Sequence, residues 1–298
     1  MTLYTHIGAN IRRTWLLFSL FFIIIIGLGW FLSYYFQDQN ILFFAAGISI
    51  FMSFISYWYS DKIVLAISGA KPLAHNENPE LYHIVENLCI TAGLPMPKIY
   101  LINDPAPNAF ATGRNPKNAV LAITAGLLQI LDRSELEGVI SHELSHVGNR
   151  DILLQTVVVV LVGAISLIAN MFMRGRLFRG KRDSNSGGGQ AGAILMIVGL
   201  VFVILSPLIA TLIQLAISRK REYLADASGA LLTRYPDGLA SALEKISKSP
   251  LKLKKATTAT AHLYIANPFK SKGLSTLFST HPPIEERIKR LRDLSSQQ

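Results

Sequence analysis

Four long stretches without an ionisable side chain constrain this chain more than any other feature. They cover residues 15–37, 40–60, 152–173 and 184–218, and none contains Asp, Glu, Lys, Arg or His. About 20 apolar residues are enough for a helix to cross the hydrocarbon core of a bilayer. Only 16% of the 298 residues are charged, whereas about 25% is usual in soluble proteins. The sequence therefore predicts an integral membrane protein.

The first two stretches predict an N-terminal transmembrane hairpin in residues 1–60, with spans at about 16–36 and 41–59. A cleaved signal peptide is the alternative, because Arg12 and Arg13 precede the first span. That span exceeds the roughly 7–15 apolar residues of a signal peptide, and no small-residue cleavage site follows it. The short loop between the spans has no positive charge, which favours an external loop and a cytoplasmic N-terminus.

The last two stretches predict hydrophobic segments at about 152–173 and 191–217, joined by a basic loop rich in glycine and serine. If both segments span the membrane, the basic loop lies outside, against the positive-inside rule. Alternatively, the two segments pack as a shallow hairpin or as a hydrophobic flank of the catalytic domain. Both arrangements return the chain to the same side.

Two parts of the chain, residues 61–151 and 219–298, have the composition of a soluble domain and are expected to form one catalytic domain. Their patterns predict mainly helices and a small β-sheet. The expected elements are a helix at 78–93, a strand at 97–102, a hairpin formed by 109–111 and 119–123, a helix from Pro236 and a last amphipathic helix after Pro282 and Pro283.

The sequence His142-Glu143-Leu144-Ser145-His146 is the strongest chemical signal in the chain. Residues 134–150 are expected to form a helix, with Ser134 and Glu137 spaced as a capping box. The two histidines then lie one turn apart on one face, where they can bind one metal ion. Glu143 is placed to accept a proton from a metal-bound water. The alternative is a surface helix that happens to carry two histidines.

A catalytic zinc needs a third protein ligand, and Glu222 is the candidate. It lies 76 positions after His146, where the fourth apolar stretch ends, and Asp226 follows it by one helical turn. Asp226 is expected to accept a hydrogen bond from a ligand histidine. Asp151 is judged too close to His146 to reach back, and Asp183 falls in the glycine-rich loop. Alternatively, Glu222 and Asp226 are two solvated acids on a surface helix.

The histidine motif, the two apolar segments after it and the sequence Arg221-Glu222-Tyr223-Leu224-Ala225-Asp226 together resemble the HtpX family of membrane-bound zinc metalloproteases, relatives of the CAAX prenyl-protein proteases. Residues 108–113 and 280–283 match two further motifs of that family. The resemblance implies a zincin-type catalytic domain with one Zn²⁺ per chain, in the bacterial inner membrane and facing the cytoplasm. It also implies a stress-response role in quality control of misfolded membrane proteins.

The resemblance also suggests His281 as a stabiliser of the oxyanion, although a position beside a helix N-terminus is a purely structural alternative for this residue. Substrate binding is expected on an exposed strand edge, to which an extended polypeptide adds as a further strand. The residues expected at that edge are Asn108, Ala109, Phe110 and Ala111, with the strand 119–123.

Other functional classes fit the sequence less well. A metal transporter needs ionisable groups within its spans, and the four stretches have none. An intramembrane protease would place its histidines inside an apolar span, but acidic and basic residues flank this motif. A CAAX-type processing protease, or a non-proteolytic zinc-binding membrane protein, remains the alternative. Despite the net charge of +10, no basic-aromatic motif suggests nucleic acid, so the expected partners are polypeptides and the lipid bilayer.

Overall fold

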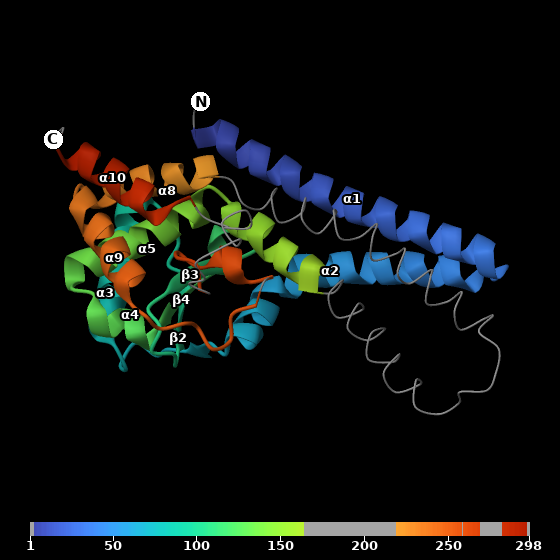
Figure 1. Ribbon diagram of the computed structural model, residues 1–298, viewed down its shortest axis with the longest axis horizontal. Helices are drawn as coiled ribbons and strands as arrows, with labels where there is room; N and C mark the ends of the chain where they lie inside the picture. The colour runs from blue at the N-terminus through green and yellow to red at the C-terminus, as the bar shows by residue number, and fades with distance from the viewer. Residues whose placement is uncertain (1–2, 164–218, 258, 269–281, 297–298) are drawn as a thin grey trace.

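The N-terminal helices form a long antiparallel hairpin that projects from the rest of the molecule (Figure 1). In this computed structural model, which describes residues 3–163, 219–257, 259–268 and 282–296, α1 is Leu3–Phe36 and α2 is Asn40–Ser68. Only 17% of the apolar window of α1 and 11% of that of α2 are buried in the protein. Both helices are long and apolar enough to cross a membrane, and their exposed apolar surface distinguishes them from core helices of a soluble protein.

Helix α2 continues beyond the predicted span and joins the hairpin to the catalytic domain. Its last turns bury Val64 and Leu65 against the sheet, where they contact Phe110. The helix ends at Gly69, whose φ of 69° lies in the left-handed region that favours glycine. The hairpin and the domain therefore share one core at this point.

The small β-sheet has four strands in the order β1-β2-β4-β3. Strand β4 lies inside the sheet, parallel to β2 and antiparallel to β3. The expectation that 119–123 forms a sheet edge is therefore wrong, because β4 is hydrogen-bonded on both sides; β3 is the edge. The strands are β1 (Lys71–Pro72), β2 (Lys98–Ile102), β3 (Ala109–Gly113) and β4 (Ala119–Thr124).

Six further labelled helices complete the catalytic domain, and the predicted mainly helical fold with a small sheet is confirmed. They are α3 (Pro79–Ala92), α4 (Ala125–Ile130), α5 (Arg133–Gly148), α8 (Arg219–Thr233), α9 (Pro236–Lys248) and α10 (Ile284–Ser295). Helix α5 lies at the centre and contacts the sheet, α3, α8 and α9 (Figure 1). A Cβ atom on Gly138 would lie only 2.6 Å from the backbone nitrogen of Leu239, so a glycine is needed where α5 and α9 cross.

The N-terminus of α5 differs from the prediction. Asp132, rather than Ser134, accepts a hydrogen bond from the backbone N–H of Glu135, and the Glu135 carboxylate accepts one from the backbone of Asp132. The capping box is therefore formed by Asp132 and Glu135. Two overlapping sequence patterns compete here, and Asp132 prevails because its backbone is extended, as an N-cap requires.

A turn at Arg150, with φ of 57°, ends α5 and begins the helix Asp151–Gly163. This helix starts the third apolar stretch, yet it is buried by protein: Leu154 and Val158 pack against Leu17 of α1. At residues 152–163 the structure thus agrees with the predicted hydrophobic flank of the catalytic domain. The rest of that stretch, the basic loop and the segment 191–217 lie outside the described residues.

Candidate active site

Helix α5 carries three of the predicted site residues into the interior. His142, Glu143 and His146 expose 1%, 2% and 5% of their surface. The spacing of four positions between the histidines places their side chains on the same face, with ring centroids 4.8 Å apart. Three ionisable groups at the centre of a domain are costly to bury unless each has a partner.

Helix α8 brings Glu222 and Asp226 to the same place. The two helices approach closely because Gly229 of α8 faces α5: a Cβ there would lie 3.0 Å from the backbone nitrogen of His142. A larger side chain at Gly229 would push α8 away from α5. The predicted pairing of Glu222 with the histidine helix is thus what the packing of α8 on α5 produces.

The ring atoms that face Glu222 are the Nε2 atoms of both histidines. They lie 3.3 Å apart, and the Glu222 carboxylate oxygens lie 3.6 Å from His146 Nε2 and 3.9 Å from His142 Nε2. Two donors of a tetrahedral zinc, each bound at about 2.0–2.1 Å, are roughly 3.3 Å apart. All three donors lie within 4.8 Å of one another. The arrangement fits one metal ion.

Hydrogen bonds fix which nitrogen each histidine presents. His142 Nδ1 lies 2.9 Å from Asp226 Oδ1, and His146 Nδ1 lies 3.0 Å from Asp151 Oδ2. Each carboxylate accepts the Nδ1 proton, which leaves the Nε2 lone pair directed at the site. Two lone pairs directed at one point suit a bound cation, and without a metal a protonated His146 ring can donate across the same 3.3 Å contact to His142.

The charges around the histidines also favour a cation. The pKa of His142 is lowered, chiefly by burial. Burial lowers the pKa of His146 too, but the hydrogen bond to Asp151 and the charge of Glu222 outweigh it and raise that pKa to about 9. Four buried carboxylates and two buried guanidinium groups meet here: Glu143, Asp151, Glu222, Asp226, Arg221 and Arg287. If all six are ionised, they leave two negative charges, which a proton on His146 balances in part and a divalent cation in full.

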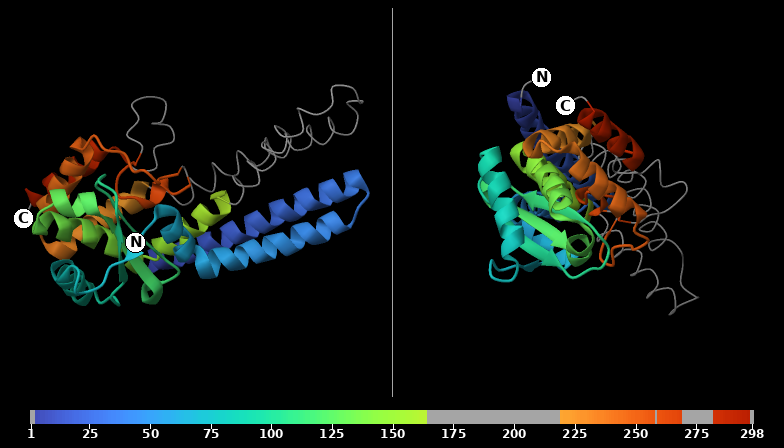
Figure 2. Two further views of the ribbon diagram at one scale, coloured as in Figure 1. Left: turned by 90° about the horizontal axis from the view of Figure 1, so that it is seen from below. Right: turned by 90° about the vertical axis from the view of Figure 1, so that its left-hand side faces the viewer.

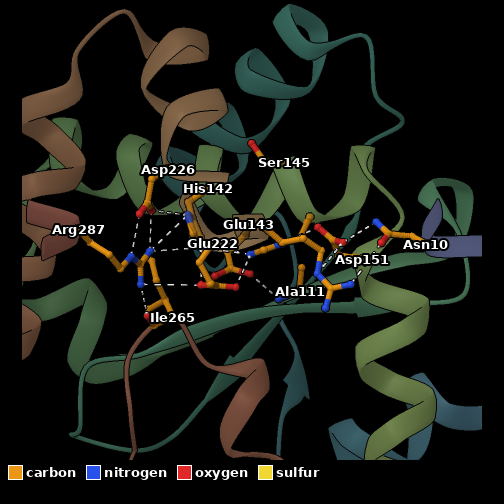
Figure 3. Close-up of polar contacts among 12 residues, drawn as sticks. Asn10, Ala111, His142, Glu143, Ser145, Asp151, Glu222, Asp226, Ile265 and Arg287 are labelled. Carbon is orange, nitrogen blue, oxygen red and sulfur yellow. Dashed lines mark hydrogen bonds and ion pairs between the residues drawn. The ribbon is translucent and has the colours of Figure 1, made fainter. Parts of the chain in front are cut away.

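Asp151 has a role that the sequence analysis missed. Its position five residues after His146 suggests that it is too close to reach back, but the left-handed turn at Arg150 breaks the helix, and the Asp151 carboxylate (labelled in Figure 3) lies beside the His146 ring. Asp151 does not face the three metal donors; it holds the opposite ring nitrogen. The five-residue separation in sequence hides this contact, because a continuous helix would not bring the two side chains together.

Arg287 is the second residue that the sequence analysis missed. It lies on α10, exposes 1% of its surface, and donates two hydrogen bonds to Asp226, at 2.7 and 2.8 Å. A third bond, of 2.9 Å, goes to the carbonyl oxygen of Ile265. Burial raises the pKa of Asp226, but Arg287 and the bond to His142 outweigh it and lower the pKa to about 2. Asp226 therefore stays ionised as the partner of His142.

Glu143 lies between the metal donors and the edge strand. Its Oε2 atom accepts a hydrogen bond of 2.8 Å from the backbone N–H of Ala111 in β3. Burial is the main cause that raises the pKa of Glu143, to about 7. A carboxyl group with a pKa near neutrality can both accept and release a proton, which suits a general base.

Comparison with known proteins places this site in a family. The model of peptidase family M48 matches residues 75–295, which include every described residue of the metal site on α5 and α8. The chain belongs to peptidase family M48. Membership of M48 makes the protein a metalloprotease, and the exposed apolar hairpin is consistent with the membrane proteases among its relatives.

Relatives of similar length extend the likeness beyond the M48 region. A protein described as "Protease HtpX homolog" from Dictyoglomus thermophilum is 48% identical over 293 residues, which cover 98% of this chain and 94% of the relative. A second relative with the same description, from Pyrococcus furiosus, is 47% identical over 285 residues, which cover 95% of this chain and 95% of the relative. The predicted resemblance to the HtpX family is confirmed.

One solved structure is also similar in fold. The crystal structure of S. mikatae Ste24p superposes with a TM-score of 0.51 at 20% sequence identity. The match covers 92% of this chain and 62% of that chain. At this identity the likeness concerns the fold alone.

The predicted substrate residues of this M48 protein are buried. Asn108 donates a hydrogen bond to the carbonyl oxygen of Ala266, and the Phe110 ring packs edge-on against Tyr264. Ala109 uses its carbonyl oxygen to accept a bond from the N–H of Ile265. The outer edge of β3 is thus partly paired within the chain. His281 lies outside the described residues.

We expect Arg287→Met to destabilise the catalytic domain by about 3–5 kcal/mol, because it leaves the Asp226 carboxylate buried without its partner. Thermal unfolding of the detergent-solubilised protein measures the effect. Arg290→Met is the matched control on the same helix. Its pair with Glu286 is exposed, so about 0–1 kcal/mol is expected. Equal melting temperatures for the two variants would contradict the prediction.

Proposed function

We propose that this protein is a membrane-embedded zinc endopeptidase, in which His142, His146 and Glu222 bind one Zn²⁺. The observation that carries the proposal is the convergence of two Nε2 atoms and one carboxylate, with both Nδ1 atoms held by Asp226 and Asp151. Nitrogen and oxygen donors in this number are typical of a catalytic zinc that leaves a position for water.

Glu143 is proposed as the catalytic base. A bound zinc ion would lower the pKa of a water molecule towards about 7 and polarise the peptide carbonyl. Glu143 accepts the proton of that water and then donates it to the leaving amine of the substrate. The hydrogen bond from Ala111 keeps the Glu143 carboxylate at the edge of β3. His281 is retained, by family resemblance, as the residue that stabilises the oxyanion.

Substrate binding is proposed along the edge of β3, formed by Asn108, Ala109, Phe110 and Ala111. The side chains of Asn108 and Phe110 are engaged in the core, so the contribution expected from this segment is its backbone. Backbone recognition is indifferent to side chains, and low sequence specificity follows. Because Ala111 already donates to Glu143, an incoming substrate competes for that N–H group.

The proposed substrates are misfolded or damaged membrane proteins, cleaved on the cytoplasmic side of the bacterial inner membrane. Support comes from the start of α1, which lies against the site through the bond from Asn10 to Asp151, and from α2, which enters the domain beside it (Figure 2). An unfolded segment that emerges from the bilayer beside the hairpin would lie close to the catalytic domain, and it must then reach metal donors that are buried. A protease that selects substrates because they are unfolded can recognise them through their exposed backbone, as proposed for the edge of β3.

Metal removal tests the proposed activity. The detergent-purified full chain is expected to contain one zinc per chain, to cleave casein and to lose that activity with a chelator. Added Zn²⁺ should restore it, because the donors stay assembled on α5 and α8. A destabilised membrane protein should be cleaved faster than its folded form. Casein cleavage that persists in fully metal-free protein would refute the proposal.

Cysteine labelling tests the proposed orientation. Cys89 is buried, and burial raises the pKa of its thiol to about 11, so it contributes little background labelling. Asp38→Cys, in the turn between α1 and α2, is expected to react with an impermeant maleimide from outside. Lys117→Cys, exposed on the catalytic domain, should react only after the membrane is opened. The reverse pattern would place the active site outside.

A further inference from the structure

Asn10 connects the first transmembrane helix to the candidate metal site. It lies near the start of α1 and exposes 3% of its surface. Its amide nitrogen donates to Asp151 Oδ1 at 2.7 Å and to the carbonyl oxygen of Asn149 at 3.0 Å. Its amide oxygen accepts a bond of 3.2 Å from Arg221 Nη1 (Figure 3). One buried side chain thus contacts two segments, residues 149–151 and Arg221, that are far from it and from each other in sequence.

These bonds reach the metal donors through Asp151. One oxygen of Asp151 holds His146 Nδ1 at 3.0 Å, and the other accepts from Asn10. A carboxylate bound at both oxygens is not free to rotate, so it fixes the plane and direction of the His146 ring. Arg221 adds a longer contact of 3.5 Å to the same oxygen. Asn10 therefore influences the orientation of His146 through two successive hydrogen bonds, one from Asn10 to Asp151 and one between Asp151 and His146.

The second bond of Asn10 supports the backbone from which Asp151 projects. The Asn149 carbonyl belongs to the turn that ends α5, next to Arg150 with its left-handed φ of 57°. That turn brings Asp151 back towards His146. By holding both the turn and the carboxylate, Asn10 stabilises the geometry on which the His146 contact depends.

Asn10 also lies outside the part of the chain that defines the protease family, since the M48 match begins at residue 75. A buried amide is costly unless its hydrogen bonds are made. Apolar packing alone would hold α1 against the helix Asp151–Gly163, as Leu17 does. The hydrogen bond from the Asn10 amide to Asp151 is therefore not needed for helix packing, and we attribute it to the metal site.

We propose that Asn10 is a positioning residue for the metal centre: it orients His146 through Asp151, so that the first transmembrane helix forms part of the zinc site. The inference rests on the proposed function, because it takes His146 as a metal ligand. It predicts that metal affinity depends on how α1 is seated on the catalytic domain.

Metal affinity of the full chain in detergent tests the proposal, measured for Zn²⁺ by chelator competition and for Co²⁺ by its visible absorption. Asn10→Leu and the isosteric Asn10→Asp remove the donor to Asp151. Both are expected to weaken Zn²⁺ binding roughly 10-fold, the lower end of the range for outer partners of a ligand, and to alter the Co²⁺ spectrum. Thr14→Val is the matched control, because Thr14 is buried one turn further along and, among the described residues, its hydroxyl donates only to the backbone carbonyl of Asn10 in its own helix.

A double variant separates positioning from a loss of fold. Asp151→Asn should weaken binding, and combining it with Asn10→Asp restores a donor and an acceptor in reversed order. The double variant is therefore expected to bind metal more tightly than Asp151→Asn alone. Additive losses, or Asn10 variants with the affinity and Co²⁺ spectrum of the unmodified protein, overturn the inference and leave the proposed function intact. If the unmodified chain binds no metal, both the inference about Asn10 and the proposed function are refuted.

Discussion

Replacing Glu143 with glutamine is expected to abolish proteolysis while the metal stays bound. Glutamine keeps the size of the side chain, and its amide oxygen can still accept the hydrogen bond from Ala111. It cannot take a proton from water, so we expect kcat to fall by about 10²–10⁴-fold. Casein cleavage and zinc content of the same preparation measure the two properties separately.

The matched control is Glu137→Gln, on the same helix but facing solvent, where the carboxylate pairs with Arg133 at 3.0 Å. It should retain full activity and full zinc content. A Glu143→Gln protein that cleaves casein at the unmodified rate would exclude Glu143 as the base. Loss of zinc in that variant would instead indicate that Glu143 holds the metal site together.

Glu222→Gln is expected to remove the metal itself. Glu222 supplies the one anionic donor of the three, and its oxygens lie 3.6 and 3.9 Å from the two Nε2 atoms. A neutral amide is a weak zinc ligand, so the loss of affinity should exceed the roughly 10–100-fold typical for outer partners. Zinc content after dialysis and chelator competition measure it, and activity should fall in parallel.

Glu244→Gln serves as the control, since Glu244 is an acidic residue on α9 that pairs with Lys248 and Arg292 at the surface. Its zinc content should not change. The zinc content of Asp226→Asn should lie between that of Glu222→Gln and that of Glu244→Gln. This substitution weakens the hydrogen bond that orients His142, but it removes no metal donor. One zinc per chain in dialysed Glu222→Gln would show that another group provides the third ligand.

Local periodicity predicts which of the proposed site residues share a helix face. His142 and His146 share a face of α5 because four residues make about one helical turn, and the same rule pairs Glu222 with Asp226 on α8. The apolar stretches likewise predicted the hairpin formed by α1 and α2. Each of these features depends on residues that are close together in the chain.

Composition did not distinguish a lipid environment from a protein interior. Residues 152–163 are as apolar as a transmembrane span, but they are buried against α1, α2 and the sheet. Both environments exclude water, so both select the same side chains. Similarly, Asp132 and Ser134 both fit a capping box, and only the backbone conformation decided between them.

The sequence alone identifies the side chains proposed to bind a metal and activate its water, because His142, Glu143 and His146 lie within one helical turn and Glu222 and Asp226 lie one turn apart. The residues that hold these side chains in place became visible only in the folded protein. Arg287 occurs in the last amphipathic helix and Asn10 in the first membrane helix, and neither belongs to a motif that points to the site. They reach Asp226 and Asp151 across 61 and 141 positions of the chain. Contacts over such separations arise from the packing of whole elements, for which a local pattern contains no signal.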